Sequence, residues 1–222
     1  WRPPAGAQWC GPMDLVRLHA LSLQGYAAVA YYDQDVELQG DLSPMLRCAS
    51  SGWLLTTSGG AGDPLNIGFF ATRPDPRLML AAKYFAGNAT FDRETGWANG
   101  GYSPEPIHYV GAECGQGFFH TLFYKRTNVA ARQALAAAGL RGADEVAGLD
   151  AAQIDRCIWN YQTGVDCPPD FDCSLVRAHH KPAGPPQHND CSKLALRPGW
   201  KPSHPPALQT AAAGATAGGE CE

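Results

Sequence analysis

Two carboxylates one residue apart follow an apolar segment near the start of the chain. Asp33-Gln34-Asp35 comes directly after residues 27–32, a run too short for a helix that indicates a buried parallel strand of an α/β sheet. Ligand sites of such sheets lie beyond the carboxyl ends of strands, so we expect both side chains to converge there. Two carboxylates can hold a hard divalent cation and leave its other positions for phosphate oxygens and water. A solvated acidic turn is the alternative, and an EF-hand is excluded because Leu38 and Pro44 stand where that loop needs glycine and glutamate.

A doubled histidine beside a lysine stands much later in the chain, at His179-His180-Lys181. Two carboxylates alone leave a divalent ion under-ligated, an imidazole nitrogen is an acceptable further ligand for Mn²⁺, and an ammonium can neutralise a diphosphate oxygen. We therefore expect this tripeptide to fold back to the acidic turn, with one imidazole nitrogen within coordinating reach, or one water, of the carboxylates. A solvated basic end is the alternative.

Short strands and capped helices must position these groups. Further strands are predicted at 53–57 and 67–71, and a helix of about three turns carries Leu15, Leu18 and Leu21. Two more helices run from Asp75 to Gly87 and from Asn128 to Gly139. The alternation predicts an α/β sandwich over residues 8–182. Residues 183–222 are rich in Ala, Gly and Pro, and we expect a disordered tail.

Composition excludes several classes of partner. The formal charge is −4 and no basic run is present, so we expect no nucleic-acid partner. The longest apolar run, 26–32, is far too short to cross a bilayer, so no membrane span is expected in this sequence, and any targeting segment or anchor would lie outside it.

The eight cysteines favour an oxidising compartment, and the sequon Asn88-Ala89-Thr90 fits the same compartment. We expect Cys167 and Cys173 to be oxidised, because they bracket a proline-bearing loop with little core of its own. A zinc cluster of cysteines and histidines over 167–191 is disfavoured, because it lacks the paired spacing of structural zinc sites.

Four segments, in order, resemble the motifs of glycosyltransferase family 8, the glycogenin-like enzymes. The segments 31–36 and 40–46 resemble its metal-binding strand, in which D-x-D is followed by a "D-L-x-x-L" step. Segment 65–70 is similar to its "F-N-S-G-hydrophobic-F" strand, and 115–119 to its "D-Q-G-x-L-N" segment. Segment 180–182 looks like a shortened form of its "H-F-x-G-x-x-K-P-W" motif.

This resemblance implies a GT-A fold, a mixed sheet flanked by helices, and a retaining, manganese-dependent (or magnesium-dependent) hexosyltransferase. Such an enzyme moves a sugar from a nucleotide-diphosphate sugar to a hydroxyl of a glycan, protein or small molecule. It also implies a location in the secretory lumen (Golgi) or outside the cell. Carried over by motif, the resemblance implies that Asp33 lies near the ribose and metal, that Asp35 is the principal metal ligand, and that His180 or His179 is the third ligand. It implies that Lys181 contacts the diphosphate. It also implies that Asn66 and Gln116 face the donor sugar as candidate catalytic residues.

The chain also departs from the family pattern. Gly115 stands where the family has aspartate, and the histidine and lysine are adjacent instead of five residues apart. The family's first strands precede the D-x-D, so a complete nucleotide site would need strands that we expect this sequence to lack. Another D-x-D transferase family, of plant or algal type, shares the "N-x-G-F-F-x-x-R-P" run ending at Pro74. The rival functions are a catalytically inactive homologue that acts as a binding or scaffold module, and a disulfide-stapled domain that binds Ca²⁺.

Overall fold

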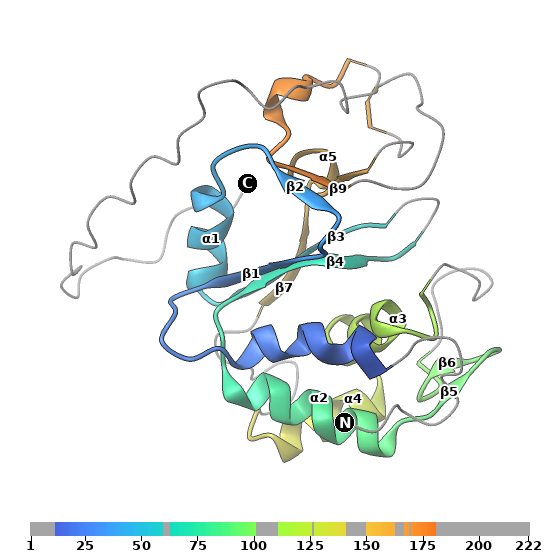
Figure 1. The fold of residues 1–222 in the computed structure, drawn as a ribbon. Coiled ribbons are helices and arrows are strands. Elements are labelled where there is room, and N and C mark those ends of the chain that lie inside the picture. Colours follow the sequence, from blue (N-terminus) through green and yellow to red (C-terminus); the bar gives the residue numbers. More distant parts are fainter. Residues whose placement is uncertain are drawn as a thin grey trace.

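The fold is a mixed α/β arrangement built around a four-stranded sheet (Figure 1). The computed structural model describes residues 12–59, 63–100, 111–125, 127–140, 150–162, 167–168 and 170–180. The sheet order is β1 (Val29–Tyr32), β4 (Asn66–Thr72), β3 (Trp53–Thr57) and β7 (Asp150–Ile154). β4 is antiparallel to both β1 and β3, whereas β7 is parallel to β3. The sheet is therefore mixed.

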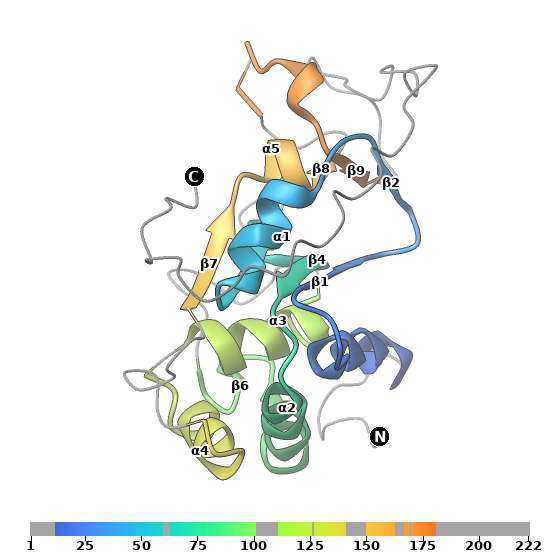
Figure 2. The same cartoon turned by 90° about the vertical axis from the view of Figure 1, so that its left-hand side faces the viewer.

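Helices cover the two faces of this sheet unequally (Figures 1 and 2). On one face gather η1 (Pro12–Ser22), α2 (Pro76–Asn88), α3 (Gly115–Phe119), η2 (His120–Tyr124) and α4 (Val129–Ala137), and on the other lies α1 (Ser43–Ser50). Neighbouring side chains on a strand point to opposite faces, so Phe70 packs in the larger cluster with the helices while Phe69 packs with Met45 of α1. Alternate side chains of β4 thus contribute to the hydrophobic clusters on both faces of the sheet.

The helix boundaries follow from capping chemistry. Asp75 precedes Pro76 and accepts a hydrogen bond from the Arg77 amide, which starts α2. Asn128 accepts from the Ala131 amide in the same way at the start of α4, and Gly139 follows that helix with a φ of +74°. Both predicted caps are confirmed.

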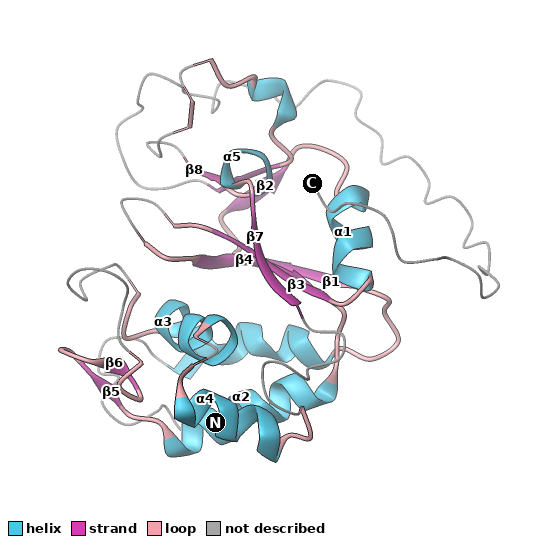
Figure 3. Ribbon diagram, turned by 180° about the vertical axis from the view of Figure 1, so that it is seen from behind, coloured by secondary structure: helices cyan, strands magenta, loops and turns pink. Residues whose placement is uncertain are grey.

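A second, three-stranded sheet stands beside the first (Figure 3). Its order is β2 (Val36–Leu38), β9 (Ala178–His180) and β8 (Tyr161–Gln162), with β9 antiparallel to β2 and parallel to β8. α5 (Arg156–Trp159) leads into β8, η3 (Cys173–Leu175) precedes β9, and a short ribbon pairs β5 (Phe91–Asp92) with β6 (Gly96–Trp97).

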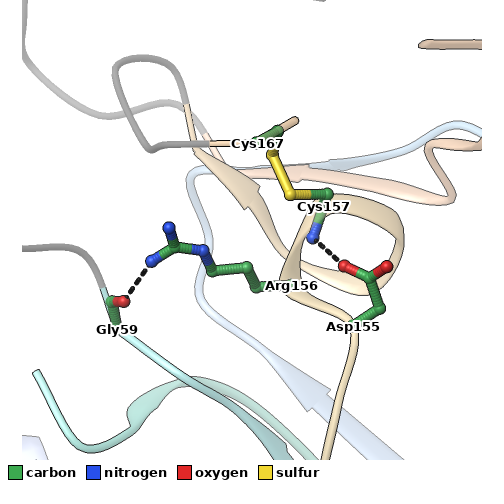
Figure 4. Close-up of a disulfide and its surroundings, with 5 residues drawn as sticks. All are labelled: Gly59, Asp155, Arg156, Cys157 and Cys167. Carbon is green, nitrogen blue, oxygen red and sulfur yellow. Dashed lines mark hydrogen bonds between the residues drawn. A yellow bond between two sulfur atoms is a disulfide. The ribbon is translucent and has the colours of Figure 1, made fainter. Parts of the chain in front are cut away.

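A disulfide between Cys157 and Cys167 ties α5 to the segment that follows β8 (Figure 4). Nearby, Asp155 accepts from the Cys157 amide at 2.8 Å, and the Arg156 guanidinium donates to the carbonyl of Gly59 at 2.5 Å. All five cysteines in the described part of the chain are disulfide-bonded, which confirms that Cys167 and Cys173 are oxidised. The partner of Cys167 is Cys157, across β8, and not Cys173 at the other end of the proline-bearing loop.

Three expectations about the elements need correction or lie outside the structure. The strand before Asp33 is neither fully buried nor parallel: β1 is half-buried, stands at one end of the sheet order and pairs antiparallel with β4. The first helix is a 3₁₀-helix that extends over Pro12–Ser22. The predicted disordered tail, 183–222, lies outside the described residues. The α/β class is confirmed, but the order of strands alone does not make the sheet a GT-A sheet.

Candidate metal centre

Asp33, Asp35 and His180 come together in the structure, although they are far apart in sequence. Each offers one ligand atom, and these atoms all lie within 4.8 Å of one another. The turn between β1 and β2 carries both carboxylates and is held at Asp33, whose amide donates to the Gly68 carbonyl at 2.8 Å. The β2–β9 pairing sets Val36 opposite His180, which brings the imidazole Nε2 to 3.4 Å from Asp35 Oδ1. The predicted return of the histidine segment to the acidic turn is confirmed for His180.

The expectation for His179 is wrong. Consecutive residues of a strand point to opposite faces, so only one of the two histidines of β9 can face the acidic turn. The His179 side chain is buried on the other face, with its ring centroid 5.3 Å from that of Tyr161. It serves as a packing residue beside β8.

Glycine at position 68 lets polar side chains of the cluster approach the backbone of β4 closely. A Cβ built there would lie 2.7 Å from His180 Cε1, 2.7 Å from Asn66 Oδ1 and 3.1 Å from Asp33 Oδ2. Any side chain would therefore intrude on the polar groups that surround it. The converging ligand atoms are two carboxylate oxygens and one imidazole nitrogen, which is a mixed set suited to a borderline divalent cation such as Mn²⁺. The residues present thus fit the cation that the acidic turn predicts.

Asn160, which sequence reasoning did not single out, orients the His180 ring. Its amide nitrogen donates to Thr57 Oγ1 at 3.0 Å and to Asn66 Oδ1 at 3.2 Å, so its own Oδ1 is the atom left to face His180 Nδ1 at 3.2 Å. The Asn66 oxygen is fixed in turn because it accepts the Gly68 amide at 2.8 Å. Asn66 therefore joins the cluster through its contact with Asn160.

Two groups contact Nδ1 of the His180 ring. Asn160 Oδ1, at 3.2 Å, can only accept from Nδ1, whereas the Gln162 amide nitrogen, at 3.1 Å, can only donate to it, so the two contacts correspond to different tautomers of the neutral ring. In the tautomer whose Nδ1 carries the proton, Nε2 is an acceptor that faces Asp35 Oδ1, also an acceptor, at 3.4 Å. A cation bound between these two atoms would favour that tautomer, with Asn160 as the acceptor on the other side of the ring.

Arg17 of η1 holds the other end of the cluster. Its Nη1 lies 3.3 Å from Asp33 Oδ1 and donates to the Ile67 carbonyl at 3.0 Å. The Tyr31 hydroxyl donates to the same Asp33 oxygen at 2.6 Å, and the guanidinium stacks over the Tyr31 ring. Burial, followed by the hydrogen bond to Asp33, raises the pKa of Tyr31 to about 12, so this hydroxyl stays a donor. Asp33 is thus held by two groups, and its second oxygen also accepts from Arg17 Nη1, at 3.4 Å.

Asp14 stands on the far side of Arg17. Its Oδ1 accepts from Arg17 Nη2 at 2.8 Å, and its Oδ2 accepts from the Gly115 amide at 2.5 Å. A carboxylate from η1 therefore lies beside the residue at which the family resemblance calls for aspartate. The signal in the sequence was Asp14 and Arg17 at i,i+3, a spacing that places two side chains on one helix face, away from the Leu15 and Leu18 stripe.

Two predicted residues remain. Gln116 lies in the first turn of α3, and its side chain comes close to Gly111, where a Cβ would stand 2.8 Å from Gln116 Nε2. Lys181 lies outside the described residues.

Comparisons of this chain with protein-family models, with curated proteins and with solved structures found no match. Within the described ranges, the structure has no helix with the length and apolar character that crossing a membrane requires. Function must therefore be argued from the cluster itself.

Proposed function

We propose that this protein is a glycosyltransferase that depends on a divalent cation, Mn²⁺ or Mg²⁺. It would move a sugar, with retention of configuration, from a nucleotide-diphosphate sugar to a hydroxyl of a glycan, a protein or a small molecule. One observation carries the proposal: Asp33, Asp35 and His180 each offer a ligand atom, and these atoms lie within 4.8 Å of one another. The four motif segments supply the reaction class, since a metal centre alone does not name one.

The proposed reaction requires two positively charged groups beside the diphosphate of the donor. The bound cation would neutralise the negative charge that develops on the leaving nucleotide diphosphate as the glycosidic bond breaks. Arg17 already engages Asp14, Asp33 and a carbonyl, so its part is to hold Asp33 in its orientation. Lys181, adjacent in sequence to His180, would place an ammonium on the diphosphate.

Hydrogen-bonding groups near the cluster would then face the sugar. Asn66 uses its oxygen within the network, which leaves its amide nitrogen as a donor for a sugar hydroxyl. Asp14 accepts one bond on each oxygen and retains a further lone pair on each, and its side chain is 24% exposed. Gln116 stands on the helix that Asp14 contacts. We place Asp14 and Asn66 at the sugar and Gln116 beside them.

The test measures cation binding, nucleotide binding and transfer in that order. Mn²⁺ binding is followed by electron paramagnetic resonance, nucleoside-diphosphate binding by calorimetry with and without Mn²⁺, and turnover by release of free nucleoside diphosphate from a panel of nucleotide sugars. Asp35→Asn should abolish Mn²⁺-dependent release. Asp41→Asn is the matched control, because Asp41 is an exposed carboxylate nearby that accepts the Ser43 amide instead of facing the cluster.

Gly115, which stands where the resemblance calls for a carboxylate, supports a second candidate function. A chain that binds Mn²⁺ and a nucleoside diphosphate but releases nothing from any donor would be a binding or scaffold module on the same site. Mn²⁺ or Ca²⁺ binding with no nucleotide affinity would overturn both and leave a cation-binding domain.

A further inference from the structure

A modification motif lies on α2, outside the metal centre. Asn88-Ala89-Thr90 is the single Asn-x-Ser/Thr triplet in the sequence. Asn88 is the last residue of α2 and is exposed, as is Thr90. Ala89 between them leaves the helix with an extended backbone, at a φ of −90° and a ψ of 146°. Both side chains that a glycosylating enzyme must recognise therefore lie at the surface, where a helix ends.

We propose that Asn88 carries an N-linked glycan. In the reaction the amide Nδ2 forms a bond to C1 of the first sugar of an oligosaccharide linked to a lipid diphosphate. The bond between that C1 and the diphosphate oxygen breaks, and the lipid diphosphate leaves with the electron pair. The proton displaced from Nδ2 passes to a base of the transferring enzyme, and nothing is oxidised or reduced.

The folded structure has room for the product. A Cβ added at the neighbouring Gly87 would meet nothing within 4 Å, so the surface around the end of α2 is open. Asn88 Nδ2 donates to the Tyr84 carbonyl at 2.7 Å. A side-chain amide has two N–H groups, and the glycan replaces one of them, so this bond to the last helical turn persists after modification.

An exposed apolar stripe beside the motif gives the glycan a physical role. Leu80 and Tyr84 are 51% and 41% exposed, and with Asn88 they follow one another at four-residue intervals along α2. Residues at this spacing share a helix face, so a glycan on Asn88 would extend over two large apolar side chains that the core does not cover. Such adjacent apolar groups otherwise favour association between molecules.

The cysteines give an independent reason to expect this chemistry. Every described cysteine is disulfide-bonded, and disulfides persist in the oxidising compartments in which N-linked glycans are added.

α2 also lies across the four-stranded sheet from β2 and β9, which frame the metal centre (Figures 1 and 2). The inference therefore does not rest on the proposed function.

The experiment expresses the full chain through the secretory pathway of eukaryotic cells and analyses both the medium and the cell-associated fraction. Peptide-N-glycosidase F in heavy-oxygen water converts a glycosylated asparagine to labelled aspartate, which peptide mass spectrometry locates. We expect label at position 88 and a loss of mass from the intact protein. Asn88→Gln and Thr90→Ala should abolish both, whereas Thr90→Ser, which keeps the motif, should retain them.

Comparison of Thr90→Ala with Thr90→Ser controls for misfolding, because Thr90→Ala leaves Asn88 and its hydrogen bond to the Tyr84 carbonyl in place. Unlabelled Asn88 in a wild-type chain whose cysteines are oxidised would overturn the proposal. So would label that persists in Thr90→Ala.

Discussion

The carboxylate of Asp14 lies in the space that a side chain at Gly115 would enter. A Cβ built on Gly115 would stand 2.6 Å from Asp14 Oδ2 and 2.6 Å from Ile67 Cδ1. The same oxygen accepts the Gly115 amide at 2.5 Å. The glycine at the start of α3 is therefore required by a carboxylate from η1, 101 residues earlier in the chain.

We expect Gly115→Asp alone to destabilise the protein, because its side chain meets Asp14 and adds a second negative charge. The cost should be about 1–3 kcal/mol. Asp14→Ala should cost a similar amount, about 1–3 kcal/mol, because the Gly115 amide and Arg17 lose an acceptor. In the double variant the new carboxylate approaches Arg17 from the other side, so the double variant should be more stable than the sum of the single changes predicts. Urea unfolding of the four proteins measures this coupling, and strictly additive costs would refute it.

His180 and His179 should differ in what their loss changes. His180→Ala removes one of three converging ligands and should weaken Mn²⁺ binding by at least about tenfold. His179→Ala removes a ring that packs on Tyr161, so it should lower stability with little effect on Mn²⁺ binding. Titration of Mn²⁺ and urea unfolding on both variants separate the two roles. Equal loss of Mn²⁺ affinity in both would contradict the strand alternation.

Asn160 should tune Mn²⁺ affinity without contacting the ion. Asn160→Ala removes the acceptor that fixes His180 Nδ1, and we expect Mn²⁺ affinity to fall by about 10–100-fold. The buried amide also bonds Thr57 and Asn66, so stability should fall too. Calorimetry at a temperature where the variant is folded isolates the first effect. Unchanged Mn²⁺ affinity there would show that the ring is positioned by other groups.

His120 should make the protein less stable as the pH falls. Burial, followed by the charge of Lys125, lowers the pKa of His120 to about 4, and in the described structure its buried Nδ1 has no hydrogen-bond partner. In the unfolded chain the ring binds a proton near the ordinary histidine pKa of 6.5, so the unfolded state gains protons first and stability falls between about pH 6.5 and about pH 4. The loss attributable to this ring should be roughly 2–3 kcal/mol. His120→Gln should flatten urea-derived stability over this range, and parallel pH profiles would refute the assignment.

The Cys157–Cys167 disulfide should affect the metal centre as well as stability. The closed loop holds Asn160 and Gln162, the two residues that contact His180 Nδ1. Cys157→Ser with Cys167→Ser should cost about 2–3 kcal/mol, because a loop of this length becomes free in the unfolded state. Mn²⁺ affinity should fall with it. A double variant that binds Mn²⁺ as wild type does, while losing stability, would show that β8 is ordered without the disulfide.

Local patterns in the sequence predicted the larger elements well. Residues 53–57 are β3, and the caps at Asp75 and Asn128 open α2 and α4, because each rests on side chains that are neighbours in sequence. The parallel, buried character assigned to 27–32 was wrong, since a short apolar run carries no information about which strand it pairs with.

The metal centre was predictable only in part. Residue types identified Asp33, Asp35 and the histidine pair, but β9 is three residues long and has no periodic pattern of its own, so the choice between His179 and His180 required the strand register. Asn160 could not be found, because its role depends on three partners brought together by both sheets.

The pairing of β2 with β9 also means that the Asp33, Asp35 and His180 side chains can come together only late in synthesis. Both carboxylates leave the ribosome early, but the imidazole that faces them is on the last strand of the described fold. A nascent or truncated chain that ends before residue 178 carries an acidic turn without its histidine. In the proposed function, a cation would therefore stabilise only a chain that has been made through β9.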